Sequence, residues 1–462
     1  MANVVPIRGL RYSPGVADFT DLVTPPYDVI DAAGQDRYYR KHPRNIIRLE
    51  YGLEYPGDDN ENNRYTRAAG YFTDWRHKGI LVRDEQPALY LYRQEFSVRD
   101  THLVRSGFIC GVRLEPYENG VVLPHEETLP KHKADRLALM QACRANFSPI
   151  FSLFADPEMA VERLLAGAAQ GEPDVGFTDE DGQIHRLWVI NDPGVIAGVQ
   201  TAMTGKTIFI ADGHHRYETA LNYSLERRKE DPNPASDRPY NFVMMTLVNL
   251  YDPGLVVLPT HRLVKNITRE ERDELLEKLE AEFTIETFPL DDHGVVLQSV
   301  LELMALRAGL PGPVSSRDIT KNKTGVNSQP PRHKHVFGLY AGEDLLHLLT
   351  LKHGVDLSNL MPRDKSAAWR GLDVSVLHRL ILERHLGIGS EQLSSGANLT
   401  YTRDEKEAIG GVNRGDYQLS LLMNPTLVEE VMAVAGNGEK MPQKSTFFYP
   451  KLITGLVINK LS

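Results

Sequence analysis

The sequence predicts an α/β protein of two domains, and three observations lead to this expectation. Residues 187–221 alternate strand-like and helix-like patterns, and they include a tight turn directly after a buried apolar run. At 462 residues the chain is longer than one hydrophobic core usually serves. The composition changes near Lys265, which places the domains at residues 1–265 and 266–462, the second with an α+β pattern.

The predicted elements of the first domain follow from apolar spacing and from turn residues. Prolines make residues 24–28 a rigid loop, because each proline fixes φ and removes a donor. Apolar residues recur at helical spacing over residues 131–144, which predicts a helix. The charged, proline-bearing residues 226–238 indicate a solvated loop. Strands are predicted at residues 45–50, with Arg48 and Glu50 on one face, and at residues 88–93, 106–113, 208–211 and 241–250.

The second domain is expected to begin with a charged amphipathic helix at residues 270–282, followed by a strand pattern from Ile285. Residues 315–333 are polar and lack periodicity, which indicates a flexible loop. A hairpin is expected from residues 336–340 and 345–351, and a helix from residues 374–386.

Composition argues against several classes of protein. Hydrophobic residues make up 41% and charged residues 25% of the chain, as in ordinary soluble globular proteins. The net charge of -10 argues against a nucleic-acid binder and against electrostatic docking to a membrane. Cys110 and Cys143 form no CxxC pair, so neither structural zinc nor a disulfide framework is expected. Residues 1–12 lack a signal-peptide core and no run of about 18 apolar residues occurs, so a cytoplasmic location is expected.

The strongest functional signal is the segment Asp212–Arg216, which follows a buried apolar strand. A helix N-terminus suits a phosphate, because it offers free N–H groups and the positive end of the helix dipole. Gly213, His214 and Arg216 are therefore candidates for phosphate binding, and Asp212 is a candidate ligand for a hard divalent cation. The alternative is a plain turn with surface histidines beside a helix cap. Five such residues after a buried strand favour the functional interpretation.

A second cluster precedes a predicted helix. His125 and Glu126 bring an imidazole beside a carboxylate, which suits general-base chemistry, and His125 is a candidate for substrate binding. Lys133 and Arg136 are three residues apart, share a helix face and are candidates to reach phosphate. The alternative is a solvated, charge-paired helix start capped by Thr128, and the sequence leaves both interpretations open.

Two further clusters lie in the second half of the chain. Thr260, His261 and Arg262 follow a predicted strand and are candidates for substrate binding. Lys444 and Ser445 lie in a proline-bounded turn that resembles a phosphate clamp. Polar pairs in turns are common, so a structural role is the alternative for both clusters. No GxxxxGK[ST], GxGxxG or GxSxG pattern occurs, so the sequence supports neither the standard nucleotide loops nor a hydrolase elbow.

The turn Asp212–Arg216 resembles the phosphate-binding turn of the ParB/sulfiredoxin superfamily, in which a strand and a helix present a Gly-x-x-Arg core. Motifs from TPPYDVI near residue 24 to MPQKSTFFYPKLITG near the C-terminus resemble, in the same order, the family catalogued as domain of unknown function 1015. This resemblance implies a ParB/sulfiredoxin-like nucleotide-binding fold for residues 1–265. Two departures matter: sulfiredoxins need a cysteine where this chain has His214, and ParB proteins carry a Gly-Glu-Arg-Arg type turn with a DNA-binding module.

The free-serine kinases of this superfamily carry a similar turn, Asp-Gly-x-His-Arg, which Asp212, His215 and Arg216 match. The similarity implies a metal-dependent small-molecule kinase that phosphorylates free L-serine to O-phosphoserine, with ATP or ADP as phosphate donor. It further implies that Asp212 binds Mg²⁺, that His215 takes part in catalysis and that an upstream glutamate is the base. Glu126 is the first choice for this base, while Glu127 and Glu50 stay open.

Two other functions remain alternatives: a non-catalytic nucleotide-binding switch, as in ParB, and a metal-dependent phosphohydrolase. A switch needs only the phosphate turn, whereas phosphoryl transfer also needs a positioned base. The expected partners are a nucleotide and a small hydroxylated metabolite, with no nucleic acid and no membrane. The sequence leaves a homodimer open and identifies neither the donor nor the acceptor.

Overall fold

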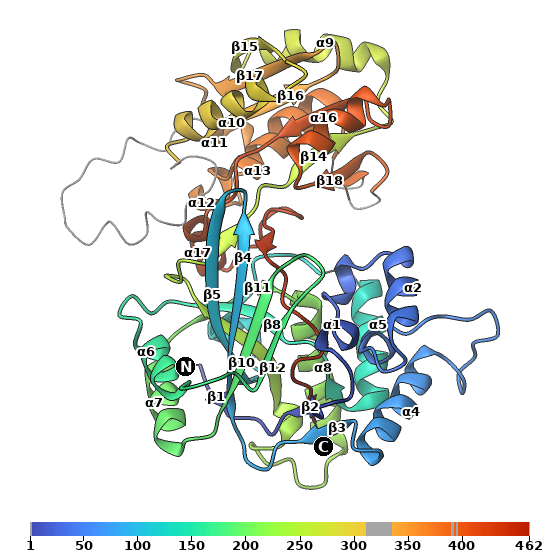
Figure 1. The fold of residues 1–462 in the computed structure, drawn as a ribbon. Coiled ribbons are helices and arrows are strands. Elements are labelled where there is room, and N and C mark those ends of the chain that lie inside the picture. The colour runs from blue at the N-terminus through green and yellow to red at the C-terminus, as the bar shows by residue number, and fades with distance from the viewer. Residues whose placement is uncertain (1, 129, 311–334, 390–391, 394–395, 462) are drawn as a thin grey trace. The chain divides into compact units, whose positions relative to one another are not determined.

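The computed structural model describes residues 2–128, 130–310, 335–389, 392–393 and 396–461 (Figure 1). The chain divides into unit 1, Met1–Leu255 with Pro450–Ser462, and unit 2, Val256–Tyr449. The division falls before the expected boundary near residue 265, because β13 (Val256–Val257) and β14 (His261–Val264) pair with strands of unit 2. The C-terminal segment belongs to unit 1, where β21 (Asn459–Lys460) pairs with β7 (Ala145–Asn146).

Unit 1 is built on a nine-stranded mixed sheet of order β6-β11-β8-β12-β5-β4-β10-β9, with β1 paired to β5. Its central strands are buried on both faces, and β8 has no exposed residue. The central strand β12 pairs parallel to β8 and antiparallel to β5. The strands are β1 (Val4–Val5), β4 (Leu89–Val98), β5 (Thr101–Arg113), β6 (Val122–Leu123), β8 (Ile150–Phe154), β9 (Val175–Thr178), β10 (Ile184–Ile190), β11 (Ile208–Asp212) and β12 (Phe242–Asn249).

Helices flank this sheet, and in Figure 1 α2, α4 and α5 gather at one side of it while α6 and α7 gather at the other. Helix α5 packs against both α4 and α8, so it joins the first helices to the segment that follows the predicted phosphate turn. The small sheet β2 (Leu10–Tyr12) with β3 (Leu81–Arg83) completes the unit. The helices are α1 (Phe19–Leu22), α2 (Ala32–Lys41), α3 (Ile47–Glu50), α4 (Arg64–His77), α5 (Pro130–Cys143), α6 (Ala160–Ala168), α7 (Pro193–Met203) and α8 (His214–Glu230), with 3-10 turns η1 (Tyr27–Val29), η2 (Tyr117–Asn119) and η3 (Pro239–Asn241).

Two predictions for unit 1 were wrong in detail. The segment 45–50 was expected to be a strand but contains helix α3, because the Asn45 side chain accepts from the Ile47 N–H at 2.9 Å and starts a helical turn. Arg48 and Glu50 therefore do not share a strand face. The loop expected at 226–238 begins only after Glu230, since three cationic residues suit the C-terminal end of α8.

Unit 2 is built on a six-stranded antiparallel sheet of order β15-β17-β16-β19-β14-β18. The expected hairpin of residues 336–340 and 345–351 is confirmed as β16 (Val336–Tyr340) and β17 (Leu345–Leu351). The expected loop at 315–333 lies outside the described residues. The other strands are β15 (Phe283–Pro289), β18 (Leu399–Thr402), β19 (Leu419–Leu422) and β20 (Phe448–Tyr449).

The helices of unit 2 include α9 (Arg269–Leu279), which confirms the amphipathic helix expected at 270–282 in a slightly shorter form. The helix expected at 374–386 is present as α13 (Asp373–Val376), a π-helical stretch η6 (Leu377–Glu383) and α14 (Arg384–Leu386). Among the described helices, none combines the length and the hydropathy needed to cross a bilayer. The remaining helices are α10 (Val295–Arg307), α11 (Leu357–Leu360), α12 (Ala367–Arg370), α16 (Glu405–Asn413) and α17 (Val428–Gly436).

Candidate anion and nucleotide site

The predicted strand, turn and helix are present as β11, Gly213 and α8. Gly213 has a φ of +100°, a conformation that side chains with a Cβ rarely adopt, and a Cβ there would lie 2.9 Å from Nη2 of Arg216. The N-cap residue of α8 is Gly213, which has no side chain to cap the helix. As in any helix, the first N–H groups have no intrahelical acceptor, and here they lie at the positive end of a 17-residue helix.

Asp212 is the centre of a charged network at this turn. Its Oδ2 accepts from Nη2 of Arg216 at 2.9 Å, and its Oδ1 accepts from Nζ of Lys451 at 2.8 Å. The three side chains are 10–16% exposed. Burial alone opposes ionisation of Asp212, but Lys451 and Arg216 outweigh it and lower the pKa of this carboxyl well below its ordinary value. The carboxylate is therefore held ionised between two cations.

Lys451 reaches this turn from the far end of the chain, and its backbone is held on both sides. The side chain of Gln94 donates to the Lys451 carbonyl at 3.0 Å, and the buried Arg105 donates to the Pro450 carbonyl at 2.6 Å. Two backbone hydrogen bonds between Thr24 and Thr454, of 3.2 and 2.8 Å, also tie this segment to the proline-rich loop. The C-terminal segment and the N-terminal loop are thus fixed beside the same turn.

Asp28, in the TPPYDVI loop, is a second carboxylate near Asp212. Its side chain keeps an exposed face, yet the protein around it raises the pKa of Asp28, first by desolvation and then through the charge of Asp212. Arg216 and Lys451 act on Asp28 in the opposite direction. Two neighbouring carboxylates with pKa values moved apart are a frequent arrangement in sites that handle protons or cations.

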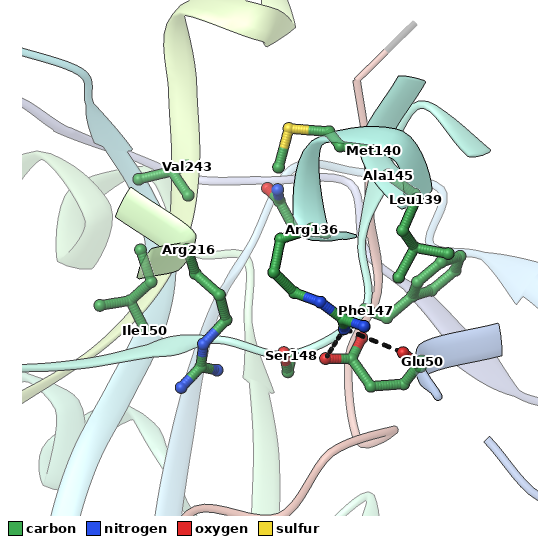
Figure 2. A pocket seen from close by; sticks show the side chains of 11 residues that line it. Glu50, Arg136, Leu139, Met140, Ala145, Phe147, Ser148, Ile150, Arg216 and Val243 are labelled. Atoms are coloured by element: carbon green, nitrogen blue, oxygen red, sulfur yellow. Dashed lines mark hydrogen bonds and ion pairs between the residues drawn. The ribbon is translucent and has the colours of Figure 1, made fainter. Parts of the chain in front are cut away.

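A pocket adjoins the network and contains a buried ion pair (Figure 2). Arg136 of α5 donates to the Glu50 carbonyl at 2.9 Å and to its Oε1 at 3.3 Å, and Ser148 donates to the same Oε1 at 2.9 Å. Arg136 also pairs with Asp135 at 2.6 Å. Figure 2 shows Arg216 lining the same pocket as Glu50 and Arg136.

Desolvation raises the pKa of Glu50, although Arg136, Arg216 and the Ser148 hydroxyl each favour its ionised form. The guanidinium of Arg136 lies over the ring of Tyr27, 3.9 Å from its centroid, which places the residue before Asp28 against this pocket. The pocket and the Asp212 network therefore share Arg216 and the TPPYDVI loop.

Two histidines near the turn, His125 and His214, are buried. His125 and His214 are 1% and 4% exposed, and their rings meet edge to face with centroids 4.7 Å apart. The His125 N–H donates to Nε2 of His214 at 3.2 Å, and Nδ1 of His125 lies 2.7 Å from the Ile210 carbonyl, which assigns the proton to Nδ1. Desolvation lowers the pKa of His125. Both rings pack β11 and the start of α8 against residues 124–126.

Other predicted residues of this unit are held elsewhere. Lys133 pairs with Glu218 of α8 at 3.0 Å, and Thr128 donates to the same carboxylate at 2.7 Å, so Lys133 and Arg136 serve different acidic partners. Glu126 and His215 are partly exposed, and the neighbouring Glu127 is exposed. Their roles remain predictions.

The other predicted residues lie in unit 2. Thr260, His261 and Arg262 are buried at 4%, 1% and 1% exposure. Ser445 is buried and donates to the Pro442 carbonyl, whereas Lys444 is exposed with a φ of +58°. Arg262 donates to the Lys444 carbonyl at 3.1 Å, so these two motifs, far apart in the sequence, meet within unit 2.

Sequence reasoning did not assign a role to Asp28, Ser148 or Lys451. Asp28 and Lys451 lie inside the two quoted family motifs, so a charged residue one or two positions after a proline in each motif was the available signal. Ser148 carries no signal of its own, because its role depends on Glu50.

A Mg²⁺ ion was expected at Asp212, and the donors present fit it in part. Among the described residues, no group of three or more histidine, cysteine, aspartate or glutamate side chains is arranged to hold a metal. Asp28 and Asp212 nevertheless provide two carboxylates, and Mg²⁺ beside a nucleotide usually takes one or two from the protein and other oxygens from phosphate and water. The repulsion that raises the pKa of Asp28 is the kind that a bound cation relieves.

Fold and site together define a mixed α/β protein in which a helix begins at a glycine beside the charged network of Asp212, Arg216 and Lys451. The chain belongs to the DUF1015 family, described as a protein of unknown function, whose model matches residues 4–375. No curated protein matches the sequence.

Three of the solved structures that resemble the chain are a free serine kinase in complex with AMP, C-terminally truncated SbnI from Staphylococcus aureus and a conserved hypothetical protein from Pyrococcus furiosus. The kinase is 14% identical with a TM-score of 0.33, over 73% of this chain and 89% of the kinase. SbnI is 10% identical with a TM-score of 0.33, over 75% and 86%. The Pyrococcus protein is 14% identical with a TM-score of 0.32, over 74% and 92%. At these values the likenesses carry no assignment of activity.

Proposed function

We propose that this protein is a metal-dependent small-molecule kinase that transfers a phosphoryl group from ATP or ADP to an alcohol, with free L-serine as the leading acceptor. One observation carries the proposal: α8 begins at Gly213, directly after a carboxylate that two cations hold ionised. The remaining support comes from the adjoining pocket, where a buried glutamate lies among arginines.

The phosphate groups would bind at the start of α8. Backbone N–H groups at a helix N-terminus and a guanidinium fork both favour phosphate oxygens. Arg216 and Lys451 are held here by Asp212, so their charges are already directed at one point before a ligand arrives. His215, in the first turn of the helix, would assist as a further donor.

Mg²⁺ would be held by Asp212 together with Asp28. When bound, it would neutralise charge on the transferring phosphoryl group, which is the main requirement of this reaction. Without it, the two carboxylates repel one another, as the raised pKa of Asp28 indicates.

Glu50 is the base that the pocket favours, and Glu126 is the base that the sequence favours. Glu50 is 4% exposed, beside Ser148 and two arginines, and burial raises its pKa, which makes the carboxylate a better proton acceptor. In the reaction the acceptor hydroxyl oxygen attacks the terminal phosphorus of the nucleotide. The bond from that phosphorus to the bridging oxygen breaks, and the hydroxyl proton passes to the carboxylate.

The decisive experiment incubates the full chain with ATP or ADP, Mg²⁺ and L-serine, and follows the products by phosphorus NMR. A new phosphomonoester signal that requires serine supports the kinase. Release of inorganic phosphate without serine would identify a phosphohydrolase instead. Binding of nucleotide with no change in it, in the presence of serine and of a wider pool of hydroxylated metabolites, would identify the switch.

Variants separate the two candidate bases. Glu50→Gln should lower turnover by about 10² to 10⁴, the usual contribution of a general base, with nucleotide affinity nearly unchanged. If Glu126→Gln shows this loss and Glu50→Gln does not, the base is Glu126. Glu127→Gln tests the other glutamate that the sequence leaves open as a base, and Glu118→Gln, which removes the same charge from an exposed position, is the control.

Nucleotide binding is tested separately by calorimetry. Arg216→Gln should weaken binding by about 1.5–3 kcal/mol, the contribution of a hydrogen bond to a charged group. Arg227→Gln removes a cation from the other end of the same helix, where Arg227 pairs with Glu230, and is the matched control. Equal affinities of the two variants would contradict the proposed phosphate site.

A further inference from the structure

Unit 2 contains a buried arginine that pairs with no carboxylate of the described residues. Arg262, on β14, is 1% exposed, and within the described residues its guanidinium meets only neutral acceptors. It donates to the carbonyls of Thr260 and Lys444 and lies 3.0 Å from Sδ of Met423, while its Nε has no partner in the described chain. Because an unpaired buried charge costs several kcal/mol, a structural arginine is normally paired with an acid.

A second arginine, partly buried and with no carboxylate partner among the described residues, directly follows the neighbouring strand β18. Tyr401 on β18 is the register partner of Arg262, and Arg403 follows two residues later. The guanidinium of Arg403 lies over the ring of Phe447, 4.0 Å from its centroid, and its Nε is buried without a hydrogen-bond partner in the part of the chain that the structure describes. The adjacent Asp404 does not pair with it, because that carboxylate caps α16 through the N–H groups of residues 406 and 407.

The two arginines act on one another and on the loop between them. The charge of Arg403 lowers the pKa of Arg262, which burial lowers first and to about 10 in total. Arg262 holds the carbonyl of Lys444, whose positive φ is rare for a residue with a side chain. Thr426 holds the next carbonyl, that of Ser445, at 2.7 Å. A strained loop is therefore fixed in place with an exposed lysine at its tip.

His378 gives an independent sign of a binding site. It lies in the π-helical stretch η6, and such stretches often occur at functional sites. The residue is 7% exposed, and its Nε2 has no hydrogen-bond partner among the described residues. Arg262 is among the groups that lower the pKa of His378, after desolvation, so the imidazole lies within electrostatic reach of the same guanidinium.

We propose that unit 2 carries a second anion-binding site, in which Arg403 and Lys444 contact the ligand and Arg262 is a positioning residue that holds the loop beneath them. The ligand would be an oxyanion, and a phosphate group fits better than a carboxylate, because its charge of about −2 neutralises more of three neighbouring cations. The guanidinium of Arg403 lies over the ring of Phe447, and a guanidinium can form a planar fork toward phosphate oxygens.

The test titrates the full chain with inorganic pyrophosphate, followed by calorimetry at low ionic strength. Two binding events are expected. Arg216→Gln should weaken the event at the start of α8, and Arg403→Gln should weaken the event in unit 2. Arg403→Gln should raise the Kd of its event by about 10- to 100-fold, as expected for a charge-assisted hydrogen bond. Arg403→Lys keeps the charge without the fork and should restore part of the affinity.

Arg414→Gln is the matched control, because Arg414 lies in the same unit but is already paired with Glu407 and Asp416. It should leave both events unchanged. A single binding event that Arg216→Gln abolishes and Arg403→Gln leaves intact would overturn the proposal, and so would equal effects of Arg403→Gln and Arg414→Gln. Tighter binding of malonate than of pyrophosphate at the Arg403 event would overturn the assignment to phosphate.

Discussion

The ion-pair network of Asp212 can be tested directly by the substitution Asp212→Asn. The amide that replaces the carboxylate leaves Arg216 and Lys451, which are 10% and 15% exposed, without their counter-charge. Two charge-assisted hydrogen bonds are lost, each with a net value of about 1.5–3 kcal/mol. Removing one partner of a buried ion pair costs about 3–5 kcal/mol, so the free energy of unfolding of unit 1 should fall by this amount.

The assay is urea unfolding followed by tryptophan fluorescence in a Trp369→Phe background. The remaining tryptophans, Trp75 and Trp188, are 3% and 8% exposed and both lie in unit 1, so the signal reports that unit. Glu180→Gln is the matched control, because Glu180 lies in the same unit and also pairs with two cations, Arg37 and Lys41, but is 49% exposed. Exposed pairs contribute about 0–1 kcal/mol.

The same network makes a prediction about pH. The folded pKa of Asp212 lies below its unfolded value of 3.8, so its stabilising contribution is present above that value and is lost as the pH falls through the folded pKa. The difference between the wild type and Asp212→Asn should be equal at pH 7 and pH 5.5 and smaller below about pH 4. A loss of stability at pH 7 no larger than that of Glu180→Gln would refute the reasoning.

Two further predictions concern unit 1. Gly213→Ala should lower the free energy of unfolding by about 1–2 kcal/mol because of its positive φ, and it should also weaken nucleotide binding by displacing Arg216. Gly15→Ala, with a φ of +82° and no atom within 4 Å of the added Cβ, should show the backbone cost alone. Equal nucleotide affinities of the two variants in calorimetry would contradict this prediction. Desolvation raises the pKa of Asp252 from 3.8 to about 6, so between these values the native state holds a proton that the unfolded state releases. The free energy of unfolding should therefore fall by about 3 kcal/mol as the pH rises from about 4 to 6. Asp252→Asn should remove this fall, and urea unfolding at pH 4.5 and pH 7 measures it; an unchanged pH dependence would show that another group is responsible.

Local pattern was sufficient for much of the fold. The hairpin at 336–340 and 345–351, the helix at 131–144 and the turn at 208–221 were predicted because their apolar spacing and turn residues lie within one short window. The segment 45–50 was predicted wrongly as a strand, because its two isoleucines are typical of strands while an asparagine side chain starts a helical turn there.

By itself, then, the sequence determined that the chain is a mixed α/β protein and that Asp212, Gly213 and Arg216 mark the junction of a buried strand with a helix. Only the tertiary structure decided what those residues meet. Lys451 pairs with Asp212 across 239 positions, and Glu50 pairs with Arg136 across 86. Such pairings depend on which strands and loops the sheet brings side by side, and this arrangement cannot be inferred from hydrophobic periodicity within a short stretch of sequence. The structure also decided that Arg262 and Lys444 meet within unit 2, because backbone carbonyls that bind a buried guanidinium leave no pattern in the residues that carry them.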